Sequence, residues 1–187
     1  MDMIIGITGT IGAGKGTIVD YLVEKFSFHH YSVRQFLMDE AQKRGMPLNR
    51  DVYVAIANEL REQNSPSYIT DQLHLIALEN GGNAVIESIR TPGEVFSLKE
   101  KGNFYLMAVD AEPHLRYERI IVRNSETDQI TFETFVENEK REMTATDPNK
   151  QNLSECIRLA DFVLRNDHDI PDLHQQVDLI VTNLLQN

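Results

Sequence analysis

Short apolar runs alternate with amphipathic segments along most of the chain. The runs at 3–7, 28–32, 84–87, 104–109 and 161–164 are typical of short, largely buried strands. Between and after these runs, apolar residues recur at helical spacing in the segments 18–26, 33–44, 52–63, 69–77, 92–101, 113–123, 132–143 and 173–184. Regular alternation of strands and helices predicts an α/β protein in which helices cover both faces of a parallel sheet.

Two stretches interrupt this alternation. About fifty mostly helical residues separate the second predicted strand from the third, and a polar stretch at 124–130 follows the helix at 113–123. The chain of 187 residues has the length of one domain. We therefore predict one domain with a core of 1–31, 84–123 and 145–187, a helical insertion at 32–83 and a second insertion at 124–144.

The first apolar run ends in a glycine-rich turn, which reads Gly9-Thr10-Ile11-Gly12-Ala13-Gly14-Lys15-Gly16-Thr17. This spacing is typical of a P-loop, in which backbone N–H groups surround the β-phosphate and the lysine reaches the β- and γ-oxygens. The helix that follows directs its positive end at the same anion. Gly16 stands where most P-loops carry a hydroxyl ligand for magnesium, and the hydroxyl comes one place later, at Thr17.

The turn resembles the Gly-x-x-Gly-x-Gly-Lys-Gly-Thr loop of adenylate kinases and related nucleoside monophosphate kinases. The preceding Ile5-Gly6-Ile7-Thr8-Gly9 also resembles the opening of dephospho-CoA kinases. The two families share the three-layer P-loop NTPase fold, so the resemblance implies a five-stranded parallel sheet in the order 2-3-1-4-5. It also implies ATP and Mg²⁺, an insertion at 32–83 that closes over the phosphate acceptor, and a lid over ATP at 124–144.

Three arginines, Arg116, Arg119 and Arg123, occur at a spacing that places them on one face of a helix. Such spacing also suits a solvated helix face. Nucleoside monophosphate kinases carry Arg-x-x-x-Arg on the helix that enters the lid, so the resemblance implies that Arg119 and Arg123 clamp the transferred phosphate. Arg141 resembles the second arginine contribution of such lids, whereas Arg116 suits either the site or the surface.

The third predicted strand ends in a carboxylate, Glu87. A carboxylate at this edge can hold Mg²⁺ beside the phosphates, together with Thr17, or it can cap the next turn. The segment Glu87-Ser88-Ile89-Arg90-Thr91 resembles the Asp-Gly-Phe-Pro-Arg-Thr segment of adenylate kinases with one residue deleted. The resemblance implies that Arg90 holds the acceptor.

The acceptor is also expected to meet residues that follow the second strand, which read Tyr31-Ser32-Val33-Arg34. The resembling kinases have Ser-Thr-Gly-Asp here, followed by an arginine whose place is taken by Met38. Ser32 and Arg34 are therefore predicted to bind the acceptor. Arg50 and Arg61 in the same insertion suit either the acceptor site or the surface.

The type of acceptor follows from chemistry. A phosphate monoester has a second pKa of about 6, so it needs cations and no general base. A hydroxyl acceptor needs a carboxylate, which dephospho-CoA kinases carry after the second strand and which is absent from 31–34. We therefore predict a nucleoside monophosphate acceptor, with dephospho-CoA as the alternative acceptor and a nucleotide-dependent switch as a third reading.

One segment favours the alternative enzyme. Residues 160–166 resemble the last strand of dephospho-CoA kinases, and the resemblance implies that Asn166 lies near the adenine of ATP. Because this loop is expected to contact ATP, the resemblance can reflect binding of the phosphate donor and not the type of acceptor.

Composition narrows the partners. A net charge of −11 argues against nucleic acid, because most of the surface would repel a polyanion. The apolar runs are far shorter than the ~20 residues that span a membrane, and no signal segment is evident, so we expect no membrane partner and a cytoplasmic protein. The expected partner is a small-molecule nucleotide, with a monomer or a homodimer both open. The single cysteine, Cys156, is expected to be a buried structural thiol.

Overall fold

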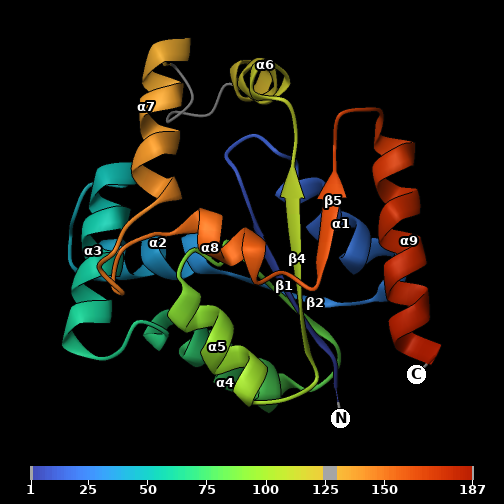
Figure 1. The fold of residues 1–187 in the computed structure, drawn as a ribbon. Coiled ribbons are helices and arrows are strands. Elements are labelled where there is room, and N and C mark those ends of the chain that lie inside the picture. The colour runs from blue at the N-terminus through green and yellow to red at the C-terminus, as the bar shows by residue number, and fades with distance from the viewer. Residues whose placement is uncertain (1, 124–129, 187) are drawn as a thin grey trace.

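The computed structural model describes residues 2–123 and 130–186, so part of the predicted lid, 124–129, lies outside the described residues. Five strands form one parallel sheet in the order β2-β3-β1-β4-β5, as predicted (Figure 1). The strands are β1 (Ile4–Gly9), β2 (His29–Ser32), β3 (Ala84–Glu87), β4 (Phe104–Asp110) and β5 (Phe162–Arg165).

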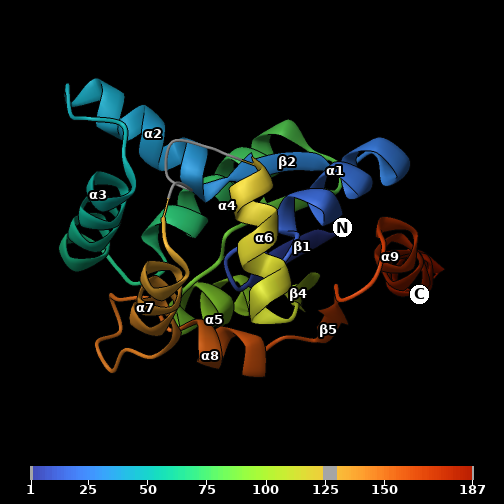
Figure 2. The ribbon, with the colours of Figure 1, turned by 90° about the horizontal axis from the view of Figure 1, so that it is seen from above.

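Helices cover both faces of this sheet (Figure 1). One face packs against α1 (Lys15–Phe26) and α9 (Ile170–Gln186). The opposite face packs against α2 (Val33–Lys43), α3 (Arg50–Gln63), α4 (Tyr68–Asn80), α5 (Pro92–Glu100) and α8 (Leu153–Arg158). Beyond the carboxyl ends of the strands, α6 (Pro113–Arg123) crosses over the sheet, and α7 (Phe132–Met143) lies to one side of it, near α3 and α8 (Figure 2).

The central strand β1 is apolar on both sides because helices cover both. Ile5 and Ile7 join the core beneath α1 and α9, whereas Ile4 joins the core on the opposite face. Gly6 is required by close packing, since a Cβ there would lie 2.5 Å from Ile89 Cδ1 and 2.6 Å from the ring of Phe104. The position of the P-loop is therefore set by a strand that is buried along its whole length.

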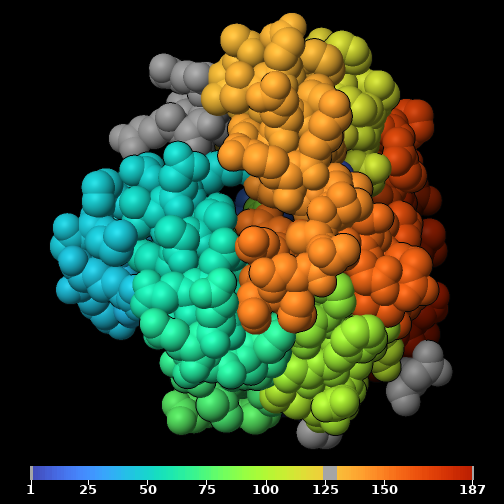
Figure 3. All heavy atoms as spheres, turned by 60° about the vertical axis from the view of Figure 1, so that its left-hand side comes forward, coloured from blue at the N-terminus to red at the C-terminus, as the bar shows by residue number. Residues whose placement is uncertain are grey.

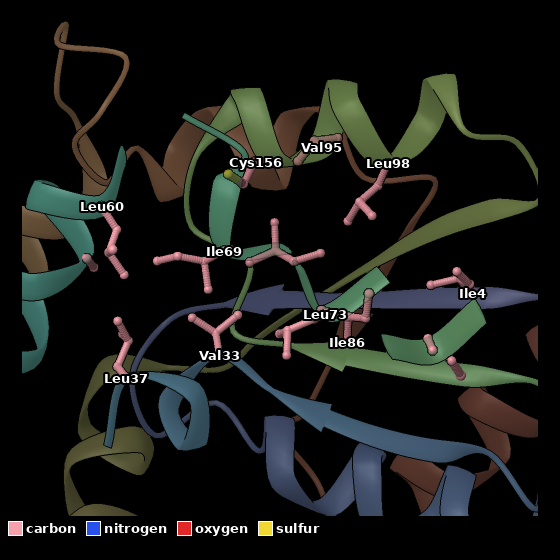
Figure 4. Packing of buried hydrophobic residues seen from close by; sticks show 14 of the residues in the cluster. Ile4, Val33, Leu37, Leu60, Ile69, Leu73, Ile86, Val95, Leu98 and Cys156 are labelled. Carbon is pink, nitrogen blue, oxygen red and sulfur yellow. The ribbon is translucent and has the colours of Figure 1, made fainter. Parts of the chain in front are cut away.

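The insertion helices share their hydrophobic core with the sheet (Figure 4). Val33, Leu37 and Ile69 pack in one cluster with Ile86 of β3. The thiol of Cys156 is buried in the same cluster, and burial raises its pKa above the ordinary value, in keeping with the expected structural role. The insertion is thus anchored beside the candidate site.

Most element boundaries lie within a few residues of those predicted, and the differences have local causes. β1 continues to Gly9 because Thr8 and Gly9 still pair with β4. Asp161 was expected to begin the last strand, but it lies just before β5, where its carboxylate accepts hydrogen bonds from Leu106 N at 2.8 Å and Lys99 Nζ at 2.9 Å. Within residues 2–123 and 130–186, no helix is both long and apolar enough to cross a membrane.

Candidate active site

The glycine-rich turn joins β1 to α1 and requires glycine at two close approaches. Gly12 has φ +75°, and a Cβ there would lie 2.4 Å from the carbonyl oxygen of Arg116. Gly14 has φ +102°, and its Cβ would lie 2.3 Å from Asn166 Nδ2. Both conformations are left-handed and strained for other residues. The backbone of the turn therefore packs directly against the segments that carry Arg116 and Asn166, and this packing fixes its position.

Lys15 curls back over the loop. Its Nζ donates hydrogen bonds to the carbonyl oxygens of Gly9 at 2.8 Å and Thr10 at 2.7 Å. Burial and, less strongly, repulsion from Arg90 and Arg123 together lower the pKa of Lys15 to about 7, although Glu87 acts in the opposite direction. An anion bound in the loop would raise the pKa of Lys15 again, because the negative charge of the anion favours the protonated amine.

The loop is braced from behind by groups at the ends of β4 and β5. Asn166 Nδ2 donates to Ala13 O at 2.8 Å, and Thr10 Oγ1 donates to Asp110 Oδ1 at 2.6 Å. Arg116 contributes a third brace, since its Nη1 donates to Ile11 O at 3.3 Å. These contacts hold the loop in place without a ligand, so little reorganisation is required when an anion binds.

A cavity of about 970 Å³ runs from the loop to the insertion helices. The space-filling view shows an opening between α3 and the segment formed by α7 and the residues after it (Figure 3). The predicted site residues that line the cavity are Ile11, Gly12, Gly14, Lys15, Gly16, Thr17, Arg34, Glu87, Arg90, Arg119, Arg123 and Asn166. Residues from both the predicted nucleotide site and the predicted acceptor site thus share one cavity.

Other predicted residues lie outside the lining of this cavity. Three of them, Gly9, Thr10 and Ala13, are buried residues of the turn itself. Their backbone carbonyls accept the hydrogen bonds from Lys15 and Asn166 described above. Ser32 caps the N-terminus of α2, and its hydroxyl donates a hydrogen bond to Glu87 at 2.7 Å. Arg141 hydrogen bonds to Asn138 and lines a smaller cavity of about 210 Å³, which adjoins the large one at Arg50 and Glu142.

Glu87 is held as a carboxylate at the end of β3. Burial opposes its ionisation, but hydrogen bonds from His30 and Ser32 outweigh burial and keep its pKa below the ordinary value. Glu87 and Thr17 line the same cavity, and their oxygens are the ligand type that Mg²⁺ prefers. In the part of the chain that the structure describes, no three His, Cys, Asp or Glu side chains form a metal site.

The arginines of α6 divide into two roles. Arg119 and Arg123 line the cavity, and Arg119 Nη2 donates to Asn166 O at 2.8 Å. Arg119 Nη1 is buried and has no hydrogen-bond partner among the described residues. An unpaired buried donor is costly, so a ligand oxygen at this point would be stabilised.

Arg116 does not share the cavity face with the other two arginines. It is buried, and its Nη1 pairs with Glu139 of α7 at 2.7 Å while its Nε donates to Ala111 O at 2.7 Å. On the same helix Ile120 is buried as well, whereas Ile121 is 43% exposed. Arg116 is thus a structural brace between α6, α7 and the loop.

The acceptor end of the cavity contains an ion cluster that the sequence did not reveal. Arg90 Nη1 donates to Glu142 Oε2 at 2.7 Å and to Gln151 Oε1 at 3.1 Å, and Arg50 also pairs with Glu142. Burial, followed by repulsion from Arg50, lowers the pKa of Arg90 to about 10. Glu142 and Gln151 lie 52 and 61 residues from Arg90 in the sequence, so no local pattern could indicate these contacts.

Arg61 forms a buried ion pair beneath this cluster. Its Nη2 lies 2.9 Å from Glu94 Oε1, and the two side chains are 1% and 0% exposed. The other carboxylate oxygen of Glu94 accepts from the backbone N–H groups of Arg90 at 2.8 Å and Thr91 at 2.9 Å. Arg61, which suited either site or surface, therefore supports the backbone that carries Arg90.

Comparisons with known proteins agree with this architecture. Residues 5–147 match the model of the AAA domain. A UPF0200 protein of Methanocaldococcus jannaschii is 30% identical over 99% of this chain and 92% of its own length. The fold is similar to shikimate kinase from Bacteroides thetaiotaomicron (TM-score 0.58, 15% identity, 99% of each chain). It is also similar to dephospho-CoA kinase from Campylobacter jejuni (TM-score 0.56, 14% identity, 100% of this chain and 98% of that one). These likenesses show a P-loop kinase fold.

Proposed function

The chain belongs to the UPF0200 family and contains an AAA domain, and we propose that it is an ATP-dependent phosphotransferase acting on nucleoside or deoxynucleoside monophosphates. The kinase-like P-loop fold supports a phosphotransferase in general. The monophosphate acceptor is the finer part of the proposal, and it is supported by the charges at the far end of the cavity.

One observation carries the proposal: a continuous cavity joins the P-loop to Arg34, Arg50 and Arg90. Phosphoryl transfer requires the two substrates to be held end to end, with positive charge around the group that moves. Guanidinium groups suit phosphate because they present several donors in a plane. The residue at the end of β2 is Ser32 rather than an acid, which suits an acceptor that is already ionised.

Different side chains of the cavity would bind the ATP, the metal ion and the acceptor. Lys15 and the loop N–H groups would hold the β- and γ-phosphates of ATP, and Arg119 and Arg123 would neutralise charge on the moving phosphoryl group. Thr17 and Glu87 would hold Mg²⁺, which would supply positive charge beside the phosphates. Arg90 and Arg34 would orient the acceptor phosphate for attack.

A hydroxyl acceptor is the second candidate, because Glu87 offers an ionised carboxylate in the same cavity. Such a carboxylate could accept the proton of an attacking hydroxyl. The low pKa of Glu87 makes it a weak base, which places this candidate second.

The deciding experiment is a transfer assay with ATP, Mg²⁺ and separate acceptors. The acceptors are the common ribonucleoside and deoxyribonucleoside 5′-monophosphates, dephospho-CoA and shikimate, and the measurement is ADP release that depends on the acceptor. We expect stimulation by one or more monophosphates. Stimulation by dephospho-CoA or shikimate alone would assign a hydroxyl acceptor, and slow hydrolysis that no acceptor stimulates would indicate a nucleotide-dependent switch.

A further inference from the structure

The carboxylate of Glu142 lies among the cations of the acceptor end. Glu142 is the penultimate residue of α7, and its side chain is 10% exposed. One oxygen is 2.7 Å from Arg90 Nη1, and the other pairs with Arg50. All three side chains line the large cavity, although Glu142 comes from α7, which lies to one side of the sheet (Figure 1). A carboxylate that bridges two guanidiniums in a cavity has the geometry of a bound anionic ligand.

We propose that Glu142 is an internal stand-in for the anionic group of the acceptor, and that a dianionic phosphate monoester displaces it from Arg50 and Arg90. This inference rests on the proposed function, adds Glu142 to the acceptor subsite and gives Arg50 a defined contact within it. It also specifies the charge of the group that the subsite accepts.

The charges of the cluster favour a dianion. Glu94 is already engaged, because its oxygens are used by Arg61 and by the backbone N–H groups of Arg90 and Thr91. The single carboxylate of Glu142 therefore offers one negative charge to two guanidiniums, Arg50 and Arg90. A carboxylate ligand would only exchange one monoanion for another, and the tethered one has the higher effective concentration. A phosphate monoester near neutral pH carries close to two charges and three acceptor oxygens.

Gln151 supports the same assignment. Its Oε1 accepts from Arg90 Nη1 at 3.1 Å, so the arginine is oriented by a neutral group even when Glu142 leaves. The buried Arg61–Glu94 pair fixes the backbone of Arg90 in the same way. The subsite would therefore keep its shape while its internal anion is replaced.

The test measures binding to the full-length protein by isothermal titration calorimetry. The ligands are adenosine, guanosine, cytidine, uridine and thymidine 5′-monophosphates and the corresponding nucleoside 5′-carboxylates. The key variant is Glu142→Gln, and the matched control is Glu137→Gln, which changes an exposed acid of the same helix. We expect Glu142→Gln to tighten binding of the preferred monophosphate roughly tenfold, the scale of one charge-assisted hydrogen bond. Glu137→Gln should bind as the wild type does.

Two further variants keep the test decisive. Arg50→Gln should weaken monophosphate binding, and combining it with Glu142→Gln should remove most of the tightening, because the two residues act at one point. If Glu142→Gln does not fold, Glu142→Asp is used instead. Its shorter side chain cannot bridge both guanidiniums, so it should also bind the monophosphate more tightly than the wild type.

The outcomes separate this inference from the proposed function. Unchanged or weaker monophosphate binding by Glu142→Gln overturns the inference, even if transfer to a monophosphate is observed. Equal binding of a monophosphate and its 5′-carboxylate also overturns it, as does the absence of monophosphate binding. Tighter binding by Glu142→Gln without any transfer supports the subsite and refutes the proposed function.

Discussion

Asn166 Nδ2 donates a hydrogen bond of 2.8 Å to the carbonyl oxygen of Ala13, and this bond joins two loops 153 residues apart in the chain. The same amide nitrogen stands 2.3 Å from the position that a Cβ on Gly14 would occupy. The loop after β5 thus fixes both the hydrogen bonding and the residue type of the P-loop.

Replacing Gly14 by alanine should lower the free energy of unfolding by roughly 1–3 kcal/mol, because φ is +102° and Asn166 blocks the added carbon. Gly16→Ala is the matched control. No heavy atom lies within 4 Å of a Cβ at Gly16, and alanine favours the first turn of α1, so stability should stay equal or rise by up to about 1 kcal/mol. Urea unfolding measures both, and equal losses in the two variants would contradict the prediction.

ATP binding should take up protons, because the buried Lys15 has a pKa of about 7 and is mostly neutral at pH 8. Triphosphate oxygens favour the charged amine, so its pKa rises on binding and up to about one proton enters per ATP. ATP affinity should consequently fall as the pH rises from 6 to 9. Calorimetry at pH 8 in buffers of different ionisation enthalpy measures the uptake. Lys15→Met should abolish it and lower transfer by orders of magnitude, whereas Lys43→Met, at an exposed site, should change neither.

Arg119→Ala should lower kcat about a hundredfold or more, since this guanidinium offers a buried, unpaired donor to the cavity. The KM for ATP should change much less, because the expected contact strengthens in the transition state. The control is Arg158→Ala on α8, whose exposed side chain pairs with Glu155. Steady-state kinetics would contradict the role if Arg119→Ala raised KM while kcat stayed normal.

Glu94→Gln should destabilise the fold by roughly 3–5 kcal/mol, because it leaves the buried cation of Arg61 without its counter-charge. The pair of Arg44 and Glu59 is the exposed counterpart, with side chains 27% and 44% exposed. Glu59→Gln should cost less than about 1 kcal/mol. Denaturant unfolding measures the free energy of unfolding of both variants. Similar losses in the two would show that burial does not make the Arg61–Glu94 pair more important for stability than the exposed pair.

Much of the fold could be predicted because each signal was local. The apolar run before Gly9 lies within the strand that it predicts. The structure shows equally local contacts at helix starts, since Asn49 accepts a hydrogen bond from Val52 N and Thr91 forms a capping box with Glu94. The strand order came from the resemblance carried by one loop, and the sheet confirms it.

The roles of individual arginines could not be predicted, since they depend on partners distant in sequence. Spacing grouped Arg116 with Arg119 and Arg123, but Arg116 is buried and donates to carbonyls outside its own helix, those of Ala111 and Ile11. Its partner Glu139 lies on another helix. Arg61 was likewise ambiguous because Glu94, its partner, lies 33 residues away.

Arg116 grips a carbonyl of the phosphate-holding turn with one end of its guanidinium and meets α7 through Glu139. Any outward movement of α7 that separates Glu139 from Arg116 would leave this buried guanidinium with only the more distant carboxylate of Asp110, at 3.6 Å, and would loosen the turn at Ile11. Movement of α7 away from the site would then be coupled to release of the bound nucleotide. Arg116 would provide this coupling although it does not line the cavity.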